Sequence, residues 1–278
     1  MLLESLSDHA AEQLKRSEDR WHQASTEASA SQRQSELAFA ELDSARRTKA
    51  RWKRLLRVTT QQEWDAESRW LDAVHRGEQA QARKHELEQT IGQQAAGADG
   101  EQAYARWLAS HVPDDWHGFG GYRNRKGEAD LVVVGPSGVW VVEVKNRNAR
   151  LFVDGDTWRY DKLDRWGNVV THGRAVDNSG RTWGQQASQV AEALEGWLTK
   201  QGQRVPVHSA VMLVHRRATL ATVRNPGVDL VDTDPEQLRR RLIAAPQVAD
   251  ARVRSTVAGL IRRDHEFHSK PRPRRSRT

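Results

Sequence analysis

Residues 127–146 read GEADLVVVGPSGVWVVEVKN, and this stretch decides the fold of the chain around it. Two valine-rich runs flank the GPSG sequence at 135–138, and such runs separated by Gly and Pro are typical of two strands joined by a tight turn. A turn centred on the Pro-Ser pair aligns residues whose numbers sum to 273. This register predicts that Asp130 lies opposite Glu143, with Cβ atoms roughly 4.5–5.5 Å apart.

The predicted hairpin gathers three charged side chains on one otherwise apolar face. Lys145 points to the same side as Glu143 because side chains alternate along a strand. Two carboxylates this close repel each other unless a cation lies between them. Lys145 supplies one positive charge, and a divalent metal would supply two more. An ion pair that merely closes the end of the sheet contributes only about 0–1 kcal/mol when exposed and does not explain the second carboxylate.

These residues resemble the D…(D/E)xK active site of the restriction-endonuclease-like superfamily. GEAD at 127–130, EVKN at 143–146 and DGDTW at 154–158 narrow the resemblance to the nuclease-related domain called NERD. The similarity runs from about residue 100 to about residue 198. The helix, strand, helix, strand order of the chain also indicates an α/β fold with a mixed sheet. We therefore expect a restriction-endonuclease-like mixed-sheet core with a long N-terminal α-helical, coiled-coil region.

The resemblance implies a metal-dependent nuclease that hydrolyses phosphodiester bonds, with DNA as the favoured substrate, in restriction, repair or defence against phage or plasmids. Asp130 and Glu143 would bind Mg²⁺ or Mn²⁺ through oxygen, which these ions prefer. The Val144 carbonyl completes the predicted metal shell. Lys145 would orient or help deprotonate the attacking water and stabilise phosphate oxygens.

Two further catalytic residues are predicted on helices. Glu101 shares a helix face with Tyr104 and Leu108, which points it inward, although an acid in a first helical turn also suits the helix dipole. The resemblance maps the acid of the family's first helix, a catalytic residue and metal ligand, onto Glu101. It maps a glutamine of the helix after the sheet onto Gln186, with Gln185 and Gln189 as rival alignments. Glu128 corresponds to a supporting position.

Residues 1–91 are expected to form a helical coiled-coil arm. Their composition is polar and helix-forming, and a sparse apolar stripe begins with Leu14, Trp21 and Ala28. The TQQE sequence at 60–63 has the form of a capping box, so the arm is either one long helix or, as we favour, an antiparallel pair folded back at 58–61. The arm would serve as a spacer or as a surface for a second copy or a protein partner.

The remaining boundaries follow from composition. We expect a linker at 92–99, the nuclease-like domain at 100–265 and a disordered basic tail at 266–278. Within the domain we predict helices at 101–111, 183–198, 235–245 and 247–265, strands at 151–153, 158–160, 205–214 and 227–231, and a loop at 161–182. Aromatic and cationic side chains alternate near this loop, a pattern that suits nucleic-acid binding or a solvated loop. The candidate nucleic-acid-binding residues are Trp158, Arg159, Lys162, Arg165 and Arg181.

The charge of the chain is unevenly distributed. The chain has 278 residues and a formal net charge of +7. Residues 1–100 contain 15 basic and 17 acidic residues, against 29 and 20 in the remainder. A basic excess around the predicted site favours a polyanionic partner. Two other functions compatible with this pattern are a non-catalytic nucleic-acid-binding module and a coiled-coil scaffold.

Cysteine is absent, which excludes disulfides, thiolate nucleophiles and cysteine-ligated zinc. No apolar run approaches the roughly 18 residues of a membrane span. We therefore expect a cytoplasmic protein without a membrane partner.

Overall fold

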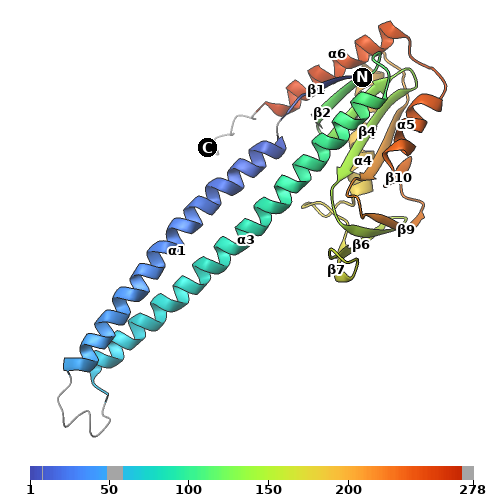
Figure 1. The fold of residues 1–278 in the computed structure, drawn as a ribbon. Helices are drawn as coiled ribbons and strands as arrows, with labels where there is room; N and C mark the ends of the chain where they lie inside the picture. The colour runs from blue at the N-terminus through green and yellow to red at the C-terminus, as the bar shows by residue number, and fades with distance from the viewer. Residues whose placement is uncertain (8, 49–58, 271–278) are drawn as a thin grey trace. The chain divides into compact units, whose positions relative to one another are not determined.

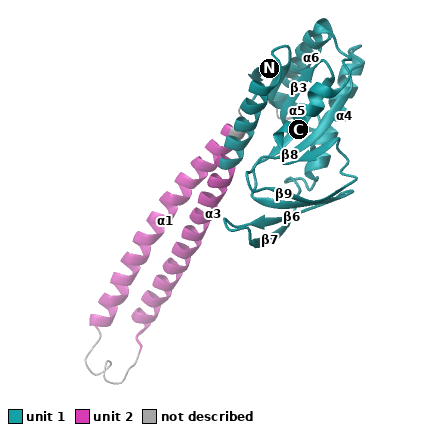
Figure 2. Ribbon diagram, turned by 45° about the vertical axis from the view of Figure 1, so that its right-hand side comes forward, with its two compact units in different colours: residues 1–9, 96–278 teal, residues 10–95 magenta. Residues whose placement is uncertain are grey.

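The computed structural model describes residues 1–7, 9–48 and 59–270. The chain divides into two compact units, which are coloured separately in Figure 2. Unit 1 consists of Met1–His9 and Ala96–Thr278, and unit 2 consists of Ala10–Ala95. Unit 1 contains helices and two sheets, so the predicted α/β class with a long helical region is confirmed.

Unit 1 is built on a six-stranded mixed sheet in the order β1-β2-β3-β4-β8-β10 (Figure 1). β2, β3 and β4 pair antiparallel, whereas β1, β8 and β10 lie parallel to their neighbours. The strands are β1 (Leu2–Ser5), β2 (His117–Asn124), β3 (Gly127–Gly135), β4 (Gly138–Lys145), β8 (Val207–Leu213) and β10 (Leu230–Asp232). β3 and β4 are covered on both faces, which explains why they read as nearly continuous runs of valine.

The β3–β4 hairpin has the predicted register. Leu131 pairs with Val142, and the ladder continues to Gly135 opposite Gly138. These pairs all keep the register centred on the Pro-Ser turn. The sequence therefore placed the two strands correctly relative to each other.

Helices cover both faces of this sheet. On one face, α4 (Trp183–Lys200) and α6 (Ala251–Ser269) pack on a core that contains Val132, Val141 and Leu194. On the other face, the end of α3 (Gln61–His111) and α5 (Pro235–Ala244) pack around Leu108, Trp140 and Leu238. A capping box of Thr182 and Gln185 starts α4, and the Asp234 side chain caps α5 by accepting from the Glu236 amide.

A second sheet has the order β7-β6-β5-β9 and packs beside the start of α4. Its strands are β5 (Ala149–Asp154), β6 (Thr157–Leu163), β7 (Val169–Arg174) and β9 (Thr219–Arg224). The prediction of a loop over 161–182 is therefore wrong for β7, and β9 was not predicted at all. β7 is mostly exposed and, among the residues that the structure describes, pairs with β6 alone, so no alternation of buried and exposed residues marks it in the sequence.

Unit 2 contains α1 (His9–Thr48) from Ala10 onward and the part of α3 up to Ala95. The two helices run antiparallel, because Trp21 Nε1 donates to Glu88 Oε1 over 3.0 Å while Arg46 lies 3.6 Å from Glu67. This confirms the favoured helical pair. The predicted fold-back at 58–61 begins outside the described residues. The capping box is present, with the Glu63 amide 3.2 Å from Thr60 Oγ1 and the Thr60 amide 3.2 Å from Glu63 Oε2.

Several predicted boundaries are corrected by the structure. Residues 92–99 are helical, so they are not a linker; glycine costs a helix only about 1 kcal/mol, and good helix formers flank both sides. Residues 2–5 belong to unit 1 as strand β1 rather than to the arm. α6 continues to Ser269, beyond the predicted end at 265. The rest of the predicted basic tail, 271–278, lies outside the described residues. No helix in the described ranges has the length and apolarity to cross a membrane.

Candidate nuclease site

Asp130 lies near the end of β3, next to the last paired residues of the β3–β4 ladder. That ladder ends at the Leu131–Val142 pair, so Asp130 and Glu143 occupy the next position of the same register. The Asp130 side chain uses this position to accept a hydrogen bond from the Val144 backbone amide, with Oδ2 2.6 Å from the nitrogen. Asp130 is therefore fixed beside β4 by its own carboxylate.

Glu143 is an acidic residue in the interior of unit 1. It is 0% exposed, and one carboxylate oxygen, Oε1, pairs with the Lys145 ammonium group. Its other oxygen, Oε2, is buried and has no hydrogen-bond partner among the described residues. A buried oxygen without a partner costs free energy, typically about 1–3 kcal/mol. This cost is what makes Glu143 the most informative residue of the site.

The site concentrates negative charge in a region shielded from water. Burial and the nearby Asp130 charge raise the pKa of Glu143 to about 8. Burial also raises the pKa of Asp130, against the opposing effects of Lys145 and of the Val144 amide. Burial alone would lower the pKa of Lys145, but Glu143 and Asp130 outweigh it and the pKa is raised. Lys145 therefore carries a fixed positive charge between two acids.

Glu101, on α3, is a third acid whose charge interacts with those of Asp130 and Glu143. It precedes the buried residues Tyr104 and Leu108 on the same helix, and its side chain is only partly exposed. Burial and the neighbouring Asp130 charge raise the pKa of Glu101 to about 8. Its charge also raises the pKa of Glu143. The prediction that Glu101 points toward the other acids therefore agrees with the electrostatics of the site.

The structure distinguishes between the candidate glutamines on α4. Gln185 is used in the capping box, where its side chain accepts from the Thr182 amide. Gln186 instead directs its amide nitrogen to the Glu128 carbonyl, 3.5 Å away and two residues from Asp130. Geometry therefore favours Gln186, the residue chosen from the resemblance.

Glu128 lies two residues before Asp130 on β3 and contacts β2 and the N-terminal segment. Its carboxylate accepts from Arg123 Nη2 over 2.8 Å and from Ser7 Oγ over 3.4 Å. Arg123 and Ser7 were not predicted as site residues. Arg123 lies opposite Glu128 on β2, so the strand register could have found it. Ser7 comes from the far N-terminal end of the chain, and nothing in the local sequence marks it.

The candidate nucleic-acid-binding residues separate into two groups. Trp158 is only 3% exposed and packs in the core under the second sheet, so its prediction as a base-stacking residue is wrong. Arg181 pairs with Asp177 at 2.7 Å and donates to the Lys126 carbonyl at 2.6 Å, so its charge is neutralised and its side chain is held in place. Side chains alternate along β6, and this alternation turns Trp158 toward the core.

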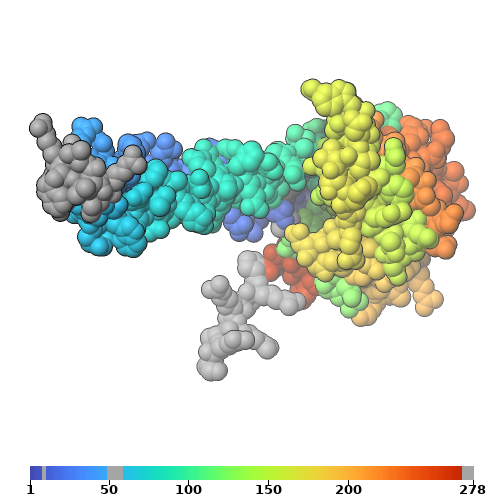
Figure 3. All heavy atoms as spheres, turned by 90° about the horizontal axis from the view of Figure 1, so that it is seen from below, coloured from blue at the N-terminus to red at the C-terminus, as the bar shows by residue number. Residues whose placement is uncertain are grey.

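The other candidates lie on the surface of the second sheet. Arg159, Lys162 and Arg165 are exposed, and Arg165 lies 3.9 Å from the centre of the Trp166 ring. Figure 3 shows the segment around these residues, in yellow, projecting from the surface. Cations beside an exposed tryptophan remain available to a polyanion.

The oxygen donors of the site suit a hard divalent cation, although they do not form a complete cage. No group of three or more His, Cys, Asp or Glu within residues 1–7, 9–48 and 59–270 is arranged to hold a metal ion. Lys145 and the Val144 amide take up one carboxylate oxygen each from Glu143 and Asp130. The unpartnered Glu143 Oε2 remains as a free oxygen ligand of the kind that Mg²⁺ and Mn²⁺ prefer.

A mixed sheet that carries an aspartate and a Glu-Val-Lys triplet at the ends of adjacent strands is the arrangement expected of a restriction-endonuclease-like domain. Residues 96–214 match the model of the NERD family, the nuclease-related domain. This segment of the chain is therefore a nuclease-related domain, and the resemblance drawn from its motifs is confirmed. Comparisons with curated proteins and with solved structures gave no match.

Proposed function

We propose that unit 1 is a metal-dependent nuclease that hydrolyses phosphodiester bonds, with DNA as its substrate. The observation that carries the proposal is the buried Glu143 carboxylate, which shares a sheet end with Asp130 and Lys145 and leaves one oxygen without a partner. A purely structural ion pair gives no reason to bury a second acid or to leave that oxygen unsatisfied. Perturbed acids beside a fixed cation are typical of catalytic sites.

The proposal assigns a role to each residue at the sheet end. Asp130 and Glu143 would hold Mg²⁺ or Mn²⁺, with Glu101 and the Val144 carbonyl as further oxygen ligands. The ion, when bound, lowers the pKa of water and neutralises charge on the phosphate. Lys145 contributes its positive charge to orienting the water and to stabilising the phosphate oxygens. In the metal-free site the neighbouring acids Glu143 and Asp130 raise the pKa of Lys145, which keeps its ammonium group charged.

Gln186 and the second sheet would position the substrate. The Gln186 side chain lies beside the strand that carries Asp130, where an amide can hydrogen-bond to water or phosphate. The exposed cations Arg159, Lys162 and Arg165 would contact the nucleic-acid backbone, which binds through its phosphates.

A cleavage assay tests this proposal. The protein is incubated with plasmid DNA, linear DNA or RNA in the presence of Mg²⁺ or Mn²⁺, beside Asp130→Ala and Lys145→Ala. Asp154→Ala is the matched control, because Asp154 is an exposed carboxylate on β5. We expect the control to cut normally and the two site variants to lose at least about 100-fold in rate, since several kcal/mol of transition-state stabilisation is removed.

The other outcomes separate the competing functions. Salt-sensitive binding of nucleic acid by the wild-type protein without cutting would support a binding module instead. The absence of both activities, together with self-association through residues 10–95, would support a scaffold. Cutting that survives in both site variants would reject the assigned residues. Circular dichroism of each variant shows whether a loss of activity reflects a loss of fold.

A further inference from the structure

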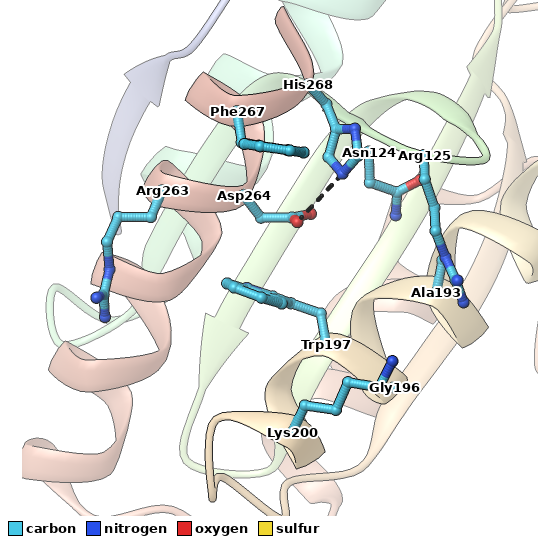
Figure 4. A pocket seen from close by; sticks show the side chains of 10 residues that line it. All are labelled: Asn124, Arg125, Ala193, Gly196, Trp197, Lys200, Arg263, Asp264, Phe267 and His268. Atoms are coloured by element: carbon cyan, nitrogen blue, oxygen red, sulfur yellow. Dashed lines mark ion pairs between the residues drawn. The ribbon is translucent and has the colours of Figure 1, made fainter.

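A second concave site lies away from the sheet end, where α4 and α6 meet the β2–β3 turn. It is a cavity of about 350 Å³ whose walls include Trp197 on α4, Phe267 on α6 and Arg125 in the turn (Figure 4). This volume is within the range of small-ligand pockets. None of the predicted nuclease residues lines the cavity, so the cleavage site does not account for it.

Two aromatic rings form the walls of this cavity. The Trp197 ring is half-buried, and its Nε1 donates to the Leu260 carbonyl over 3.4 Å, which fixes the ring against α6. Phe267 is 74% exposed although phenylalanine is among the most apolar side chains. Figure 4 shows the two rings on opposite sides of the Asp264 carboxylate. A flat aromatic group entering the cavity would therefore meet a ring on each side.

Polar side chains also line the cavity, among them Asp264, Arg125 and Lys200. Asp264 is buried, accepts a hydrogen bond from the Tyr122 hydroxyl over 2.5 Å and lies 3.6 Å from His268 Nε2. Its carboxylate retains acceptor capacity for an amino group. Arg125 and Lys200 line the cavity with exposed side chains, and neither has an ion pair with any residue that the structure describes. The cavity therefore combines an acceptor inside with free positive charge at its edge.

We propose that this cavity binds one unstacked nucleotide of a nucleic-acid strand. The base lies between Trp197 and Phe267, an amino group on its edge donates to Asp264, and the adjoining phosphate lies against Arg125 and Lys200. Aromatic stacking with cations that follow the backbone is the usual way in which proteins bind single strands. The cavity is a binding site separate from the cleavage site, and its occupancy needs no metal.

Charge argues against other occupants. The basic segment at 270–278 follows α6 directly, but it carries the same charge as Arg125 and Lys200. An acidic peptide would match the two cations but would bring further carboxylates toward Asp264. A nucleotide satisfies both ends, because its base edge carries donors and its phosphate carries the negative charge.

Binding of a dye-labelled single-stranded oligonucleotide tests the proposal, measured by fluorescence anisotropy with a chelator present. Phe267→Ala removes one stacking surface, and we expect about tenfold weaker binding. Gly196→Leu fills the cavity and should weaken binding similarly; a Cβ at this lining glycine meets nothing within 4 Å, so the fold should tolerate the change. Arg125→Ala should reduce the dependence of binding on salt by about one phosphate contact. Arg252→Ala, an exposed cation at the other end of α6, is the control and should bind like the wild type.

Competition identifies the group that enters the cavity. A mononucleotide should displace the labelled strand at lower concentration than ribose phosphate or inorganic phosphate does. Equal competition by these phosphates, or wild-type affinity in both Phe267→Ala and Gly196→Leu, would overturn the proposal. Because cleavage does not occur in the chelator, these results are independent of whether the protein is a nuclease.

Discussion

The two units differ in how exposed their ion pairs are. In unit 2, the ion pairs between α1 and α3 lie on the surface, as with Arg83 and Glu27, 3.7 Å apart and more than half exposed. The described residues buried there are mainly alanines, such as Ala24, Ala28 and Ala66, together with Leu42 and Ser17, and none of them is charged. In unit 1, the Glu143 side chain is 1% exposed and that of its partner Lys145 is 21% exposed. Burying charge is costly, so the buried acid of unit 1 supports the proposal that the cleavage site lies there.

The largest loss of stability should come from breaking the Glu143–Lys145 ion pair of unit 1. Lys145→Met leaves Glu143 buried without its cation, and we expect a loss of about 3 kcal/mol in the free energy of unfolding. The measurement is chemical denaturation of the metal-free protein. The double variant Glu143→Leu with Lys145→Met should recover most of this stability while remaining inactive. A double variant as unstable as the single one would show that the unpaired charge is not the cause.

Two glycines of α3 should respond in opposite directions to the same change. A Cβ at Gly100, in unit 1, would lie 2.4 Å from the Asn146 Cβ, so Gly100→Ala should destabilise by about 1–3 kcal/mol despite the better helix propensity of alanine. A Cβ at Gly77, in unit 2, meets nothing within 4 Å, so Gly77→Ala should stabilise by about 0.4–1 kcal/mol. Thermal unfolding of both variants measures the difference. Shifts of equal sign would contradict the contact at Gly100.

A buried histidine should make unit 1 sensitive to acid. Burial lowers the pKa of His265, while the nearby Glu128 and Glu266 raise it and Arg123 lowers it. Its Nδ1 accepts from the Arg123 amide over 3.1 Å, which requires this nitrogen to be unprotonated. Below its ordinary pKa of about 6.5 the unfolded chain binds the proton more readily, so stability is lost as the pH falls from there through the folded pKa.

Denaturation at several pH values tests this dependence. His265→Gln should be less stable at neutral pH but should lose less stability between about pH 7 and pH 5 than the wild type. His22→Gln, which replaces an exposed histidine of α1, is the control and should keep the wild-type profile. An unchanged profile in His265→Gln would assign the acid sensitivity to other groups.

The smallest effect should come from the surface ion pairs of unit 2. Arg83→Ala removes the partner of Glu27, and we expect a change of less than about 1 kcal/mol that shrinks further in high salt. Denaturation at low and high ionic strength measures it. A loss as large as that of Lys145→Met would remove the contrast between the two units.

The sequence alone determined the features that depend on neighbouring residues. The turn between two valine runs set the hairpin register, and with it the placement of Asp130, Glu143 and Lys145 on one sheet end. Thr60 and Glu63 identified the start of α3 because a capping box needs only a single helical turn. The period of its own helix predicted that Glu101 points toward the other acids, and the nearby Asp130 charge contributes to raising its pKa.

Only the tertiary structure decided what depends on packing between distant segments. It buried Trp158 in the core and placed the Gln186 side chain against the β3 backbone. It also brought Phe267 and Trp197 to one cavity. The physical reason is that periodicity fixes which residues of an element share a face, whereas the partner of that face is chosen by long-range packing.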